Sequence, residues 1–273
     1  GPRDGEAVVR IHNTNSKKII VARFSVAGGH AVVTGDFAIP GLQGTGAKVA
    51  LDFLDPTDTR GRGTLPTGQA ADLMTLEDGR EVRVTMIDAA IPSVFVAAAG
   101  IGGDTRTHPA NIDADAILMA QLEEIRRRAS VAMGLTPNAE AAALQIATPK
   151  VAMVGPASCY EDLTGVQHAP QTQDLQIRMI SAGQAHRAVP MTGTLALACA
   201  AVIKNSVVAG CIAKGADPLN LRIGTPSGIV TVGATHNPAT GAVGGVRILR
   251  TQRRLMDGHI YVSLPAVPVL PQI

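Results

Sequence analysis

The sequence has few of the features that mark secreted, membrane or metal-binding proteins. It contains no run of about 18 or more consecutive apolar residues, and its first residues lack the charged, apolar and small-residue series of a signal peptide. The three cysteines, Cys159, Cys199 and Cys211, are an odd number and lack the two- to four-residue spacing of structural zinc sites. We therefore expect a cytoplasmic protein with free thiols.

Charge and aromatic residues are also scarce. The net charge is +2, charged residues make up 17% of the chain, and there are four Phe, two Tyr and no Trp. A weak field does not attract nucleic acid or an anionic membrane, and few rings are available to stack on bases. We expect neither nucleic acid nor membrane as a partner.

The common sequence motifs of cofactor-dependent enzymes are missing too. There is no G-x-x-x-x-G-K-[ST] phosphate loop, no G-x-S-x-G nucleophile elbow and no H-E-x-x-H zinc helix. The seven histidines show no i, i+4 spacing, and the pair Asp113 and Asp115 stands where a helix needs amino-terminal caps. We expect no metal and no other cofactor.

What the chain does contain is a turn-rich pattern of short strands. Apolar residues make up 46%, and the 29 Gly and 17 Pro are spread between short β-type runs. A stretch rich in Pro, Gly, Thr and Arg, 55–72, is the best candidate for a domain boundary. The predicted strands are Val8–Ile11, Ile19–Val26, Ala31–Thr34, Val49–Leu54, Val82–Val96 with a break at Ile91-Pro92, Val151–Val154, Leu175–Ile180, Val207–Ile212, Leu219–Ile223, Ile229–Val232, Val246–Arg250 and Ile260–Val262.

Three helices are predicted from periodicity. One begins near Asp113 or Asp115 and ends at Gly134, because its apolar residues Leu118, Leu122, Ile125, Ala129 and Met133 form one stripe. A weaker one spans Pro137–Ala147. The third, Leu195–Ile203, is apolar on every side and must be surrounded by protein.

The start of this apolar helix is the first candidate site. Thr192, Gly193 and Thr194 would leave unpaired backbone N–H groups and the positive end of the helix dipole facing the preceding residues, His186 and Arg187. This arrangement favours a carboxylate pocket. The alternative is that Thr192 simply caps the helix.

A second candidate is the turn Gly224-Thr225-Pro226-Ser227-Gly228. Its Ser227 hydroxyl and the backbone N–H groups around Gly228 could hold another carboxylate. The alternative is an ordinary connection between two strands.

The order of several segments resembles one family over almost the whole chain. The 2-methylaconitate cis-trans isomerase and 4-oxalomesaconate tautomerase family has similar segments at Arg10–Asn15, Leu51–Pro56, Leu65–Gly68, Ile112–Asp115, Ala132–Leu135, Ser181–Ala188, Met191–Thr194, Gly224–Gly228 and Arg250–Val262. The resemblance implies an α/β (α+β) fold of the diaminopimelate-epimerase-like type. In that fold two pseudo-symmetric domains each curl a sheet around a central helix, and the substrate lies between the two helix amino termini.

The resemblance also implies a domain division. Residues 1–58 would be the remainder of the first domain, with 250–265 as returning strands. Residues 59–249 would form the second domain, with its central helix at about 192–204.

The resemblance implies a cofactor-independent isomerase or tautomerase that moves a double bond in a small unsaturated polycarboxylate by proton transfer. His186-Arg187-Ala188 and Met191-Thr192-Gly193 look closer to the tautomerases, which favours 4-oxalomesaconate in aromatic-acid catabolism; 2-methylaconitate is the alternative substrate. On this interpretation Met191, Thr192, Gly193 and Thr194 surround a substrate carboxylate, His186 and Arg187 orient it, and Ser227 and Gly228 supply a second contact. Met191 stands where epimerases of this fold carry a cysteine, which argues against amino-acid epimerase chemistry.

The family's catalytic lysine, and its cysteine in a Cys-Gly-Asn turn, have no counterparts in this chain. We therefore expect an upstream segment to be missing and the chain on its own to be inactive. Among the residues present, His186 is the candidate catalytic group. A non-catalytic carboxylate-binding protein is the main alternative from another class, and the sequence leaves a homodimer open.

Overall fold

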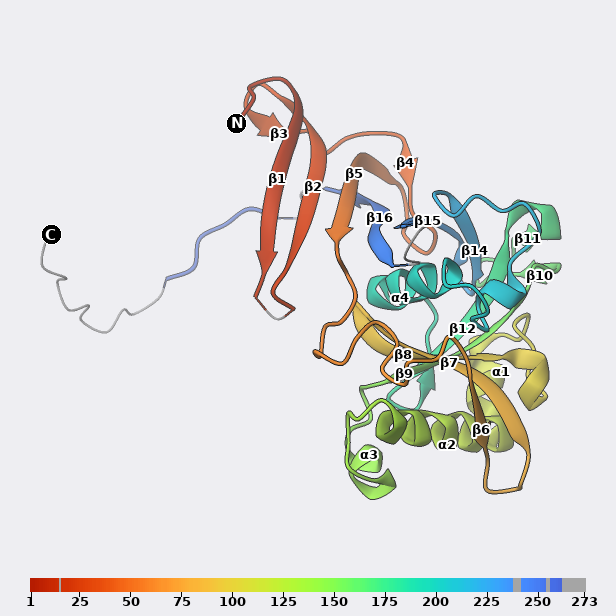
Figure 1. Ribbon diagram of the computed structural model, residues 1–273. Helices are drawn as coiled ribbons and strands as arrows, with labels where there is room; N and C mark the ends of the chain where they lie inside the picture. Colours follow the sequence, from red (N-terminus) through yellow and green to blue (C-terminus); the bar gives the residue numbers. More distant parts are fainter. Residues whose placement is uncertain (15, 238–241, 254–255, 262–273) are drawn as a thin grey trace, which may run out of the picture.

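The computed structural model describes residues 1–14, 16–237, 242–253 and 256–261 (Figure 1). The α-helices are α1 (Pro109–Ala114), α2 (Ala116–Ala132), α3 (Ala139–Leu144) and α4 (Met191–Ala201), and the 3-10 helices are η1 (Ala98–Ile101), η2 (Pro170–Thr172) and η3 (Ala209–Cys211). The strands are β1 (Gly5–Asn13), β2 (Lys18–Ala27), β3 (His30–Ala31), β4 (Phe37–Ala38), β5 (Thr45–Leu54), β6 (Asp72–Thr75), β7 (Glu81–Ala89), β8 (Ile91–Ala97), β9 (Lys150–Pro156), β10 (Tyr160–Glu161), β11 (Gln167–His168), β12 (Leu175–Ser181), β13 (Gln184–Ala185), β14 (Leu221–Thr225), β15 (Gly228–His236) and β16 (Val243–Gln252).

Most strands belong to one 14-stranded sheet. Its main path runs β1-β2-β5-β16-β15-β14-β12-β9-β8-β7-β6, while β3, β4 and β13 pair at its margins and β10-β11 form a separate ribbon. Pairing is antiparallel except between β12 and β14 and between β8 and β9. The carboxyl-terminal strand β16 therefore joins the amino-terminal strands β1, β2 and β5 to the rest of the sheet.

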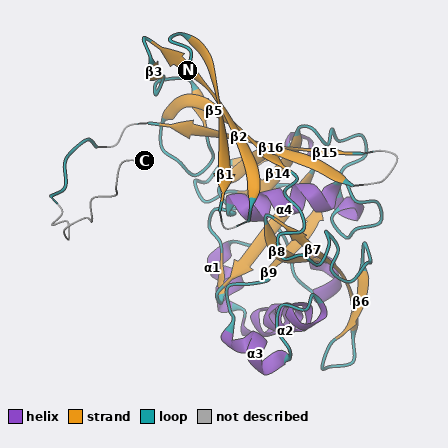
Figure 2. Cartoon of the chain, turned by 60° about the vertical axis from the view of Figure 1, so that its left-hand side comes forward, coloured by secondary structure: helices purple, strands orange, loops and turns teal. Residues whose placement is uncertain are grey.

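The sheet curls around α4. This helix packs against β7 and β8 on one side and against β15 and β16 on another, and Figure 2 shows it lying between these groups of strands. Residues 193–200 of α4 are all buried. A helix that is apolar all round has to be enclosed in this way, as its sequence predicts.

The helix α2 covers the opposite face of the sheet. Its predicted stripe, from Leu118 to Met133, is buried in a second cluster that includes Val151 and Met153 of β9. The alternate residues of β9, Ala152 and Val154, face α4, as the two-residue period of a strand requires. No helix in the described part of the chain is long and apolar enough to cross a membrane.

The two aspartates before α2 have different partners. The Asp115 carboxylate accepts a hydrogen bond from the Leu118 N–H at 3.0 Å, so Asp115 is the predicted cap of α2. The Asp113 carboxylate instead accepts from the Ala185 N–H at 2.7 Å. Asp113 therefore ties α1 to β13, directly before His186.

One predicted strand, Val207–Ile212, is wrong. The segment is a turn that contains η3, because local bonds use the backbone groups that a strand would pair. The Ser206 hydroxyl donates to the Ala200 carbonyl at 2.6 Å and accepts from the Ala209 N–H at 2.9 Å. The Val207 N–H donates to the Thr85 hydroxyl, which fastens the turn to β7.

The structure also changes the extent of other predicted strands. The prediction for Ala31–Thr34 is confirmed only in part, since β3 ends at Ala31. Ile260 and Tyr261 are not in a strand, and Val262, like 263–265 of the predicted returning strands, lies outside the described residues. The division into domains 1–58 and 59–249 stays a prediction.

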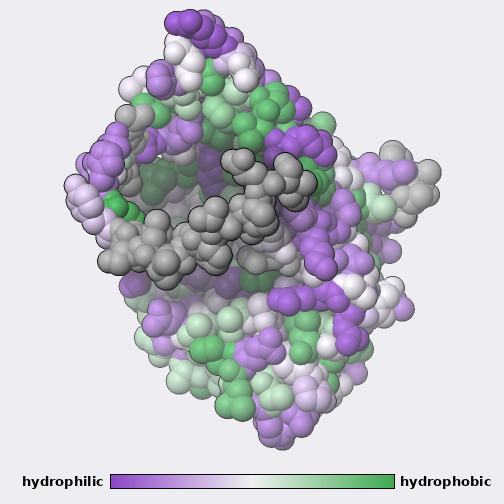
Figure 3. Space-filling view, turned by 90° about the vertical axis from the view of Figure 1, so that its left-hand side faces the viewer, coloured by the Kyte–Doolittle hydropathy of each residue, from purple (hydrophilic) through white to green (hydrophobic). Residues whose placement is uncertain are grey.

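One face of β1, β2 and β5 is apolar and only partly covered. The register places Val9 opposite Ala22 and Ile11 opposite Ile20, on the face that continues through Leu51 into the cluster around α4. Val9 and Ile11 are 43% and 42% exposed. In Figure 3, which views the molecule from the side of β1, hydrophobic atoms gather on the upper part of the surface.

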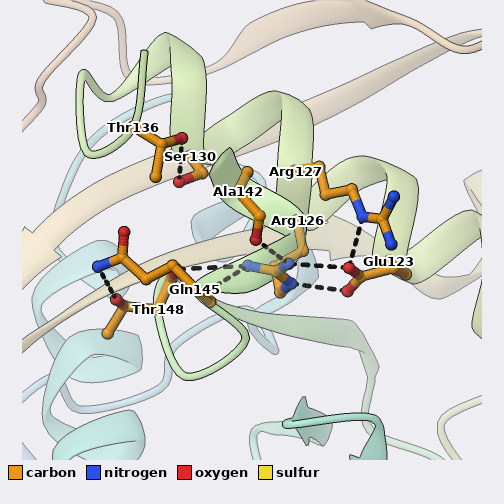
Figure 4. A network of polar contacts seen from close by, with 8 residues as sticks. All are labelled: Glu123, Arg126, Arg127, Ser130, Thr136, Ala142, Gln145 and Thr148. Carbon is orange, nitrogen blue, oxygen red and sulfur yellow. Dashed lines mark hydrogen bonds and ion pairs between the residues drawn. The ribbon is translucent and has the colours of Figure 1, made fainter. Parts of the chain in front are cut away.

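A buried arginine fixes α2, α3 and the loop that leads into β9 (Figure 4). The Arg126 side chain is 3% exposed and donates to both carboxylate oxygens of Glu123, at 2.6 and 2.8 Å. It also donates to the carbonyls of Ala142, Gln145 and Thr148. Burial alone raises the pKa of Glu123, but the hydrogen bonds from Arg126 and Arg127 hold it below its usual value.

We predict that Arg126→Ala lowers the free energy of unfolding by about 3 kcal/mol, because three carbonyls lose their side-chain donor and Glu123 keeps only Arg127. The matched control is Arg128→Ala, since Arg128 is 41% exposed and pairs with Glu124 one turn away; its expected cost is below about 1 kcal/mol. Urea unfolding followed by circular dichroism measures both values. Equal costs for the two variants would contradict the role assigned to Arg126.

Candidate functional site

The amino-terminal end of α4 has backbone donors that the helix does not use. Pro190 occupies the N-cap position, and no side chain caps the helix from there. The first N–H used within the helix is that of Thr194, which donates to the Pro190 carbonyl at 3.0 Å. Thr192 lies inside the first turn, so the alternative that it caps α4 is wrong. The N–H groups of Met191, Thr192 and Gly193 point out of the helix end.

A cavity of about 660 Å³ lies in front of this helix end. It collects residues from the β1–β2 turn, the end of β5, the β7–β8 turn and the loop before β9. The lining residues are Asn13, Ser16, Lys18, Ile19, Ile20, Phe53, Leu54, Pro56, Thr59, Arg60, Ala90, Ile91, Pro92, Thr148, Met191 and Thr192.

The charged groups of the cavity are cationic. Lys18 and Arg60 line it, and the helix end adds partial positive charge. The Lys18 ammonium is paired with the Asp55 carboxylate at 2.8 Å, but Asp55 does not line the cavity. With an apolar wall from Phe53 and Ile91, the cavity suits a small molecule that carries carboxylates on a carbon skeleton.

His186 lies beside the same helix end, although it does not line the cavity. Its N–H donates to the Met179 carbonyl at 2.8 Å, which extends the pairing of β13 with β12. Burial, and then the charge of Lys150, lower the pKa of His186 below its ordinary value. Its Nε2 atom is buried and has no hydrogen-bond partner among the described residues.

The other residues predicted at this junction differ in solvent exposure. Arg187 is exposed and Met191 and Thr192 are half-buried, while Gly193 and Thr194 are buried. A Cβ added to Gly193 would collide with the Sδ and Cε atoms of Met179. Gly193 therefore leaves room for the end of the Met179 side chain, and only its backbone is available to a ligand.

Ser227 and Gly228 are not among the residues that line the cavity at the start of α4. The strand before their turn, β14, pairs with β12 through Leu175 and Gln176, whereas β13 pairs with β12 through Ile180 and Ser181. A second substrate contact there stays a prediction.

Polar groups around the Ser227 turn form hydrogen bonds with neighbouring residues. Ser227 is 8% exposed, and the Pro226 carbonyl accepts from the Leu163 N–H at 2.8 Å. The neighbouring Asp162 carboxylate is buried, which opposes ionisation. Hydrogen bonds from the hydroxyl and N–H of Thr164, from His168 and from the Val166 N–H outweigh burial and lower its pKa to about 2. The hydrogen-bonding capacity of Asp162 is therefore used by its own neighbours.

Sequence reasoning missed the cationic side of the cavity. Lys18 is the first residue of β2 and Arg60 lies in the loop after β5, positions with no local signal of binding. The pairing of β2 with β5 brings them to α4. Lys150 was also missed, since in sequence it is an ordinary residue at the start of a strand.

The fold and the site together define an α/β protein in which the amino-terminal end of a central helix opens into a cationic cavity. The chain belongs to the PrpF protein family, whose sequence profile matches residues 4–263. The similarities to individual proteins agree with this assignment.

Two relatives and one solved structure are informative. A 2-methyl-aconitate isomerase from Shewanella oneidensis is 32% identical over 97% of this chain and 68% of its own length. A (4E)-oxalomesaconate Delta-isomerase from Novosphingobium sp. is 29% identical over 94% of this chain and 66% of its own length. The crystal structure of a methylitaconate-delta-isomerase matches with a TM-score of 0.88 at 31% identity, covering 98% of this chain and 70% of that one.

These comparisons confirm the predicted family and the predicted α/β fold class of the diaminopimelate-epimerase-like type. The matched relatives are isomerases. The chain spans about two thirds of the length of these relatives.

We predict that Gly193→Ala lowers the free energy of unfolding by about 1–3 kcal/mol, because the added methyl group forces Met179 out of its buried position. Gly210→Ala is the control, since a Cβ at Gly210 meets nothing within 4 Å. Thermal and urea unfolding measure both. If Gly193→Ala is as stable as Gly210→Ala, the room needed by Met179 is not the reason for the glycine.

Proposed function

We propose that this chain carries the polycarboxylate-binding site of a cofactor-independent isomerase, which moves a double bond in a small unsaturated polycarboxylate by proton transfer. The observation that carries the proposal is the meeting of three features in one cavity: the unused N–H groups of the first turn of α4, Lys18 and Arg60. The names of the relatives, which are isomerases of unsaturated polycarboxylates, support the same class.

The chemistry requires a base and a place for negative charge. Removing a proton from the carbon next to a conjugated double bond places charge on the carboxylate or oxo oxygens, and returning the proton to another carbon completes the shift. In this account the N–H groups of Met191, Thr192 and Gly193 stabilise that charge, and Lys18 and Arg60 hold the remaining carboxylate. His186 is the candidate base among the residues of this chain.

The particular substrate is a finer proposal. The sequence favours 4-oxalomesaconate, while 2-methylaconitate is the substrate in the name of the relative from Shewanella oneidensis. Identities of 32% and 29% are too similar to separate the two. Side-by-side binding of the two acids separates them, because the oxo group of one and the methyl group of the other need different partners in the cavity.

The amino terminus of α4 can be tested with a matched pair of variants. Met191→Pro removes one backbone donor and suits the first position of a helix, where proline is favoured; the preceding Pro190 already has the extended backbone that proline requires. Met191→Ala removes the same side chain but keeps the N–H. We predict that trans-aconitate binds about tenfold more weakly to Met191→Pro than to Met191→Ala, or about 1.4 kcal/mol.

Isothermal titration calorimetry measures this difference, with circular dichroism as the check on folding. Butyrate, which has one carboxylate, is the control ligand and should bind far more weakly than trans-aconitate to the unaltered chain. Equal affinity of the two variants for trans-aconitate would remove the helix terminus from the site. Failure of every di- and tricarboxylate to bind the unaltered chain would overturn the proposed function.

A further inference from the structure

Three polar side chains share the α4 face of the sheet. Along β9, Ala152 and Val154 face α4, so Lys150 projects to the same side two residues earlier. Along β12, Leu175, Ile177 and Met179 face α4, which places Ser181 on that face as well. His186 stands opposite Met179 through the bond of its N–H and therefore shares the face too.

Lys150 is a half-buried cation without a carboxylate partner among the described residues. Its Nζ donates to the Ser181 hydroxyl at 2.6 Å, a bond that favours the charged ammonium, while burial lowers its pKa from the usual alkaline range. Burying the Lys150 ammonium costs solvation free energy, and no ion pair among the described residues offsets that cost. Its neighbour Thr148 lines the cavity, and the Thr148 carbonyl is held by Arg126.

No carboxylate that faces His186 among the described residues offsets the positive charge of Lys150. The first two turns of α4 contain no titratable side chain. On β12, Ser181 shares the α4 face, whereas the cation Arg178 alternates to the opposite face and donates to the Thr107 carbonyl. Asp113 of α1 is occupied with the Ala185 N–H, and Ala185 is buried in the cluster on the opposite face. Arg187 is exposed and adds positive charge rather than negative.

We propose that Lys150 is a positioning residue of this site: its ammonium group, held by Ser181 on the α4 face of the sheet, repels a proton from the His186 imidazole and keeps Nε2 free to accept one. The proposal rests on the proposed function, in which His186 is the candidate base. Lys150 itself touches neither cavity nor ligand; it acts through His186.

The sign of the effect follows from like charge. A neighbouring cation disfavours the protonated imidazole, so His186 stays neutral to lower pH than it would without Lys150. A neutral imidazole can accept a proton from carbon, whereas a protonated one cannot. Lys150 therefore extends the acidic side of the pH range in which His186 is able to act.

The test is an NMR titration of the histidine Cε1–H signals, with the His186 signal assigned by its absence in His186→Asn. We expect Lys150→Gln to raise the pKa of His186, because one of its two lowering causes is removed, and Lys150→Arg to leave it low. Lys204→Gln is the matched control: Lys204 is exposed beyond the other end of α4, and its loss should not move the His186 titration. An unchanged pKa in Lys150→Gln, or an equal rise in Lys204→Gln, overturns the proposal.

A fallback variant covers the case in which Lys150→Gln is unstable. If Lys150→Gln does not fold, Lys150→Met, which keeps the length of the side chain but not its charge, is titrated in its place; an unchanged His186 pKa in that variant overturns the proposal. The titration needs no ligand, so it also separates the two claims. A Lys150-dependent shift in a chain that binds no polycarboxylate would leave the Lys150–His186 link standing and reject the proposed function.

Discussion

The structure depends on one constraint: α4 is apolar on every side and has to be enclosed, yet its first turn has backbone donors that the helix cannot satisfy. Enclosure explains why the sheet curls and why β16 returns to pair with β5. It also explains Gly193, which lets the helix lie close to Met179 of β12. The first turn of α4 lines the cavity together with Lys18 and Arg60, so the unsatisfied donors lie at the same cavity.

The buried polar groups near β12 are satisfied to different degrees. The Asp162 carboxylate accepts hydrogen bonds from Thr164, Val166 and His168. Lys150 has only a hydroxyl partner, and the Nε2 atom of His186 has no partner among the described residues. A satisfied polar group stabilises the fold, whereas an unsatisfied one keeps hydrogen-bonding capacity for a ligand or a proton.

Much of the fold could be predicted from local pattern. The stripe from Leu118 to Met133 gave the position of α2, and the all-apolar run after Thr194 predicted an enclosed helix, because both depend on neighbours in sequence. The segment Val207–Ile212 was mistaken for a strand, since an apolar run is equally consistent with a buried turn and only Ser206 and Thr85 decide between them.

Only the part of the site that is contiguous in sequence could be predicted. His186 to Thr194 are contiguous, so their meeting could be expected, but Lys18, Arg60 and Thr148 reach α4 through strand pairings that no local pattern encodes. The Gly224–Gly228 turn has the composition of an anion-binding loop, and composition does not tell whether such a loop is already bonded to its neighbours. In the structure Ser227 and Gly228 are not among the cavity-lining residues.

The central claim is that the amino terminus of α4 holds a substrate carboxylate. The most direct measurement is an NMR titration of backbone amide signals with trans-aconitate. Our account predicts that the largest chemical-shift changes fall on the amides of Met191, Thr192 and Gly193, in the downfield direction that a hydrogen bond to a carboxylate produces. Changes confined to the Ser227 turn, or spread evenly over the surface, would contradict it.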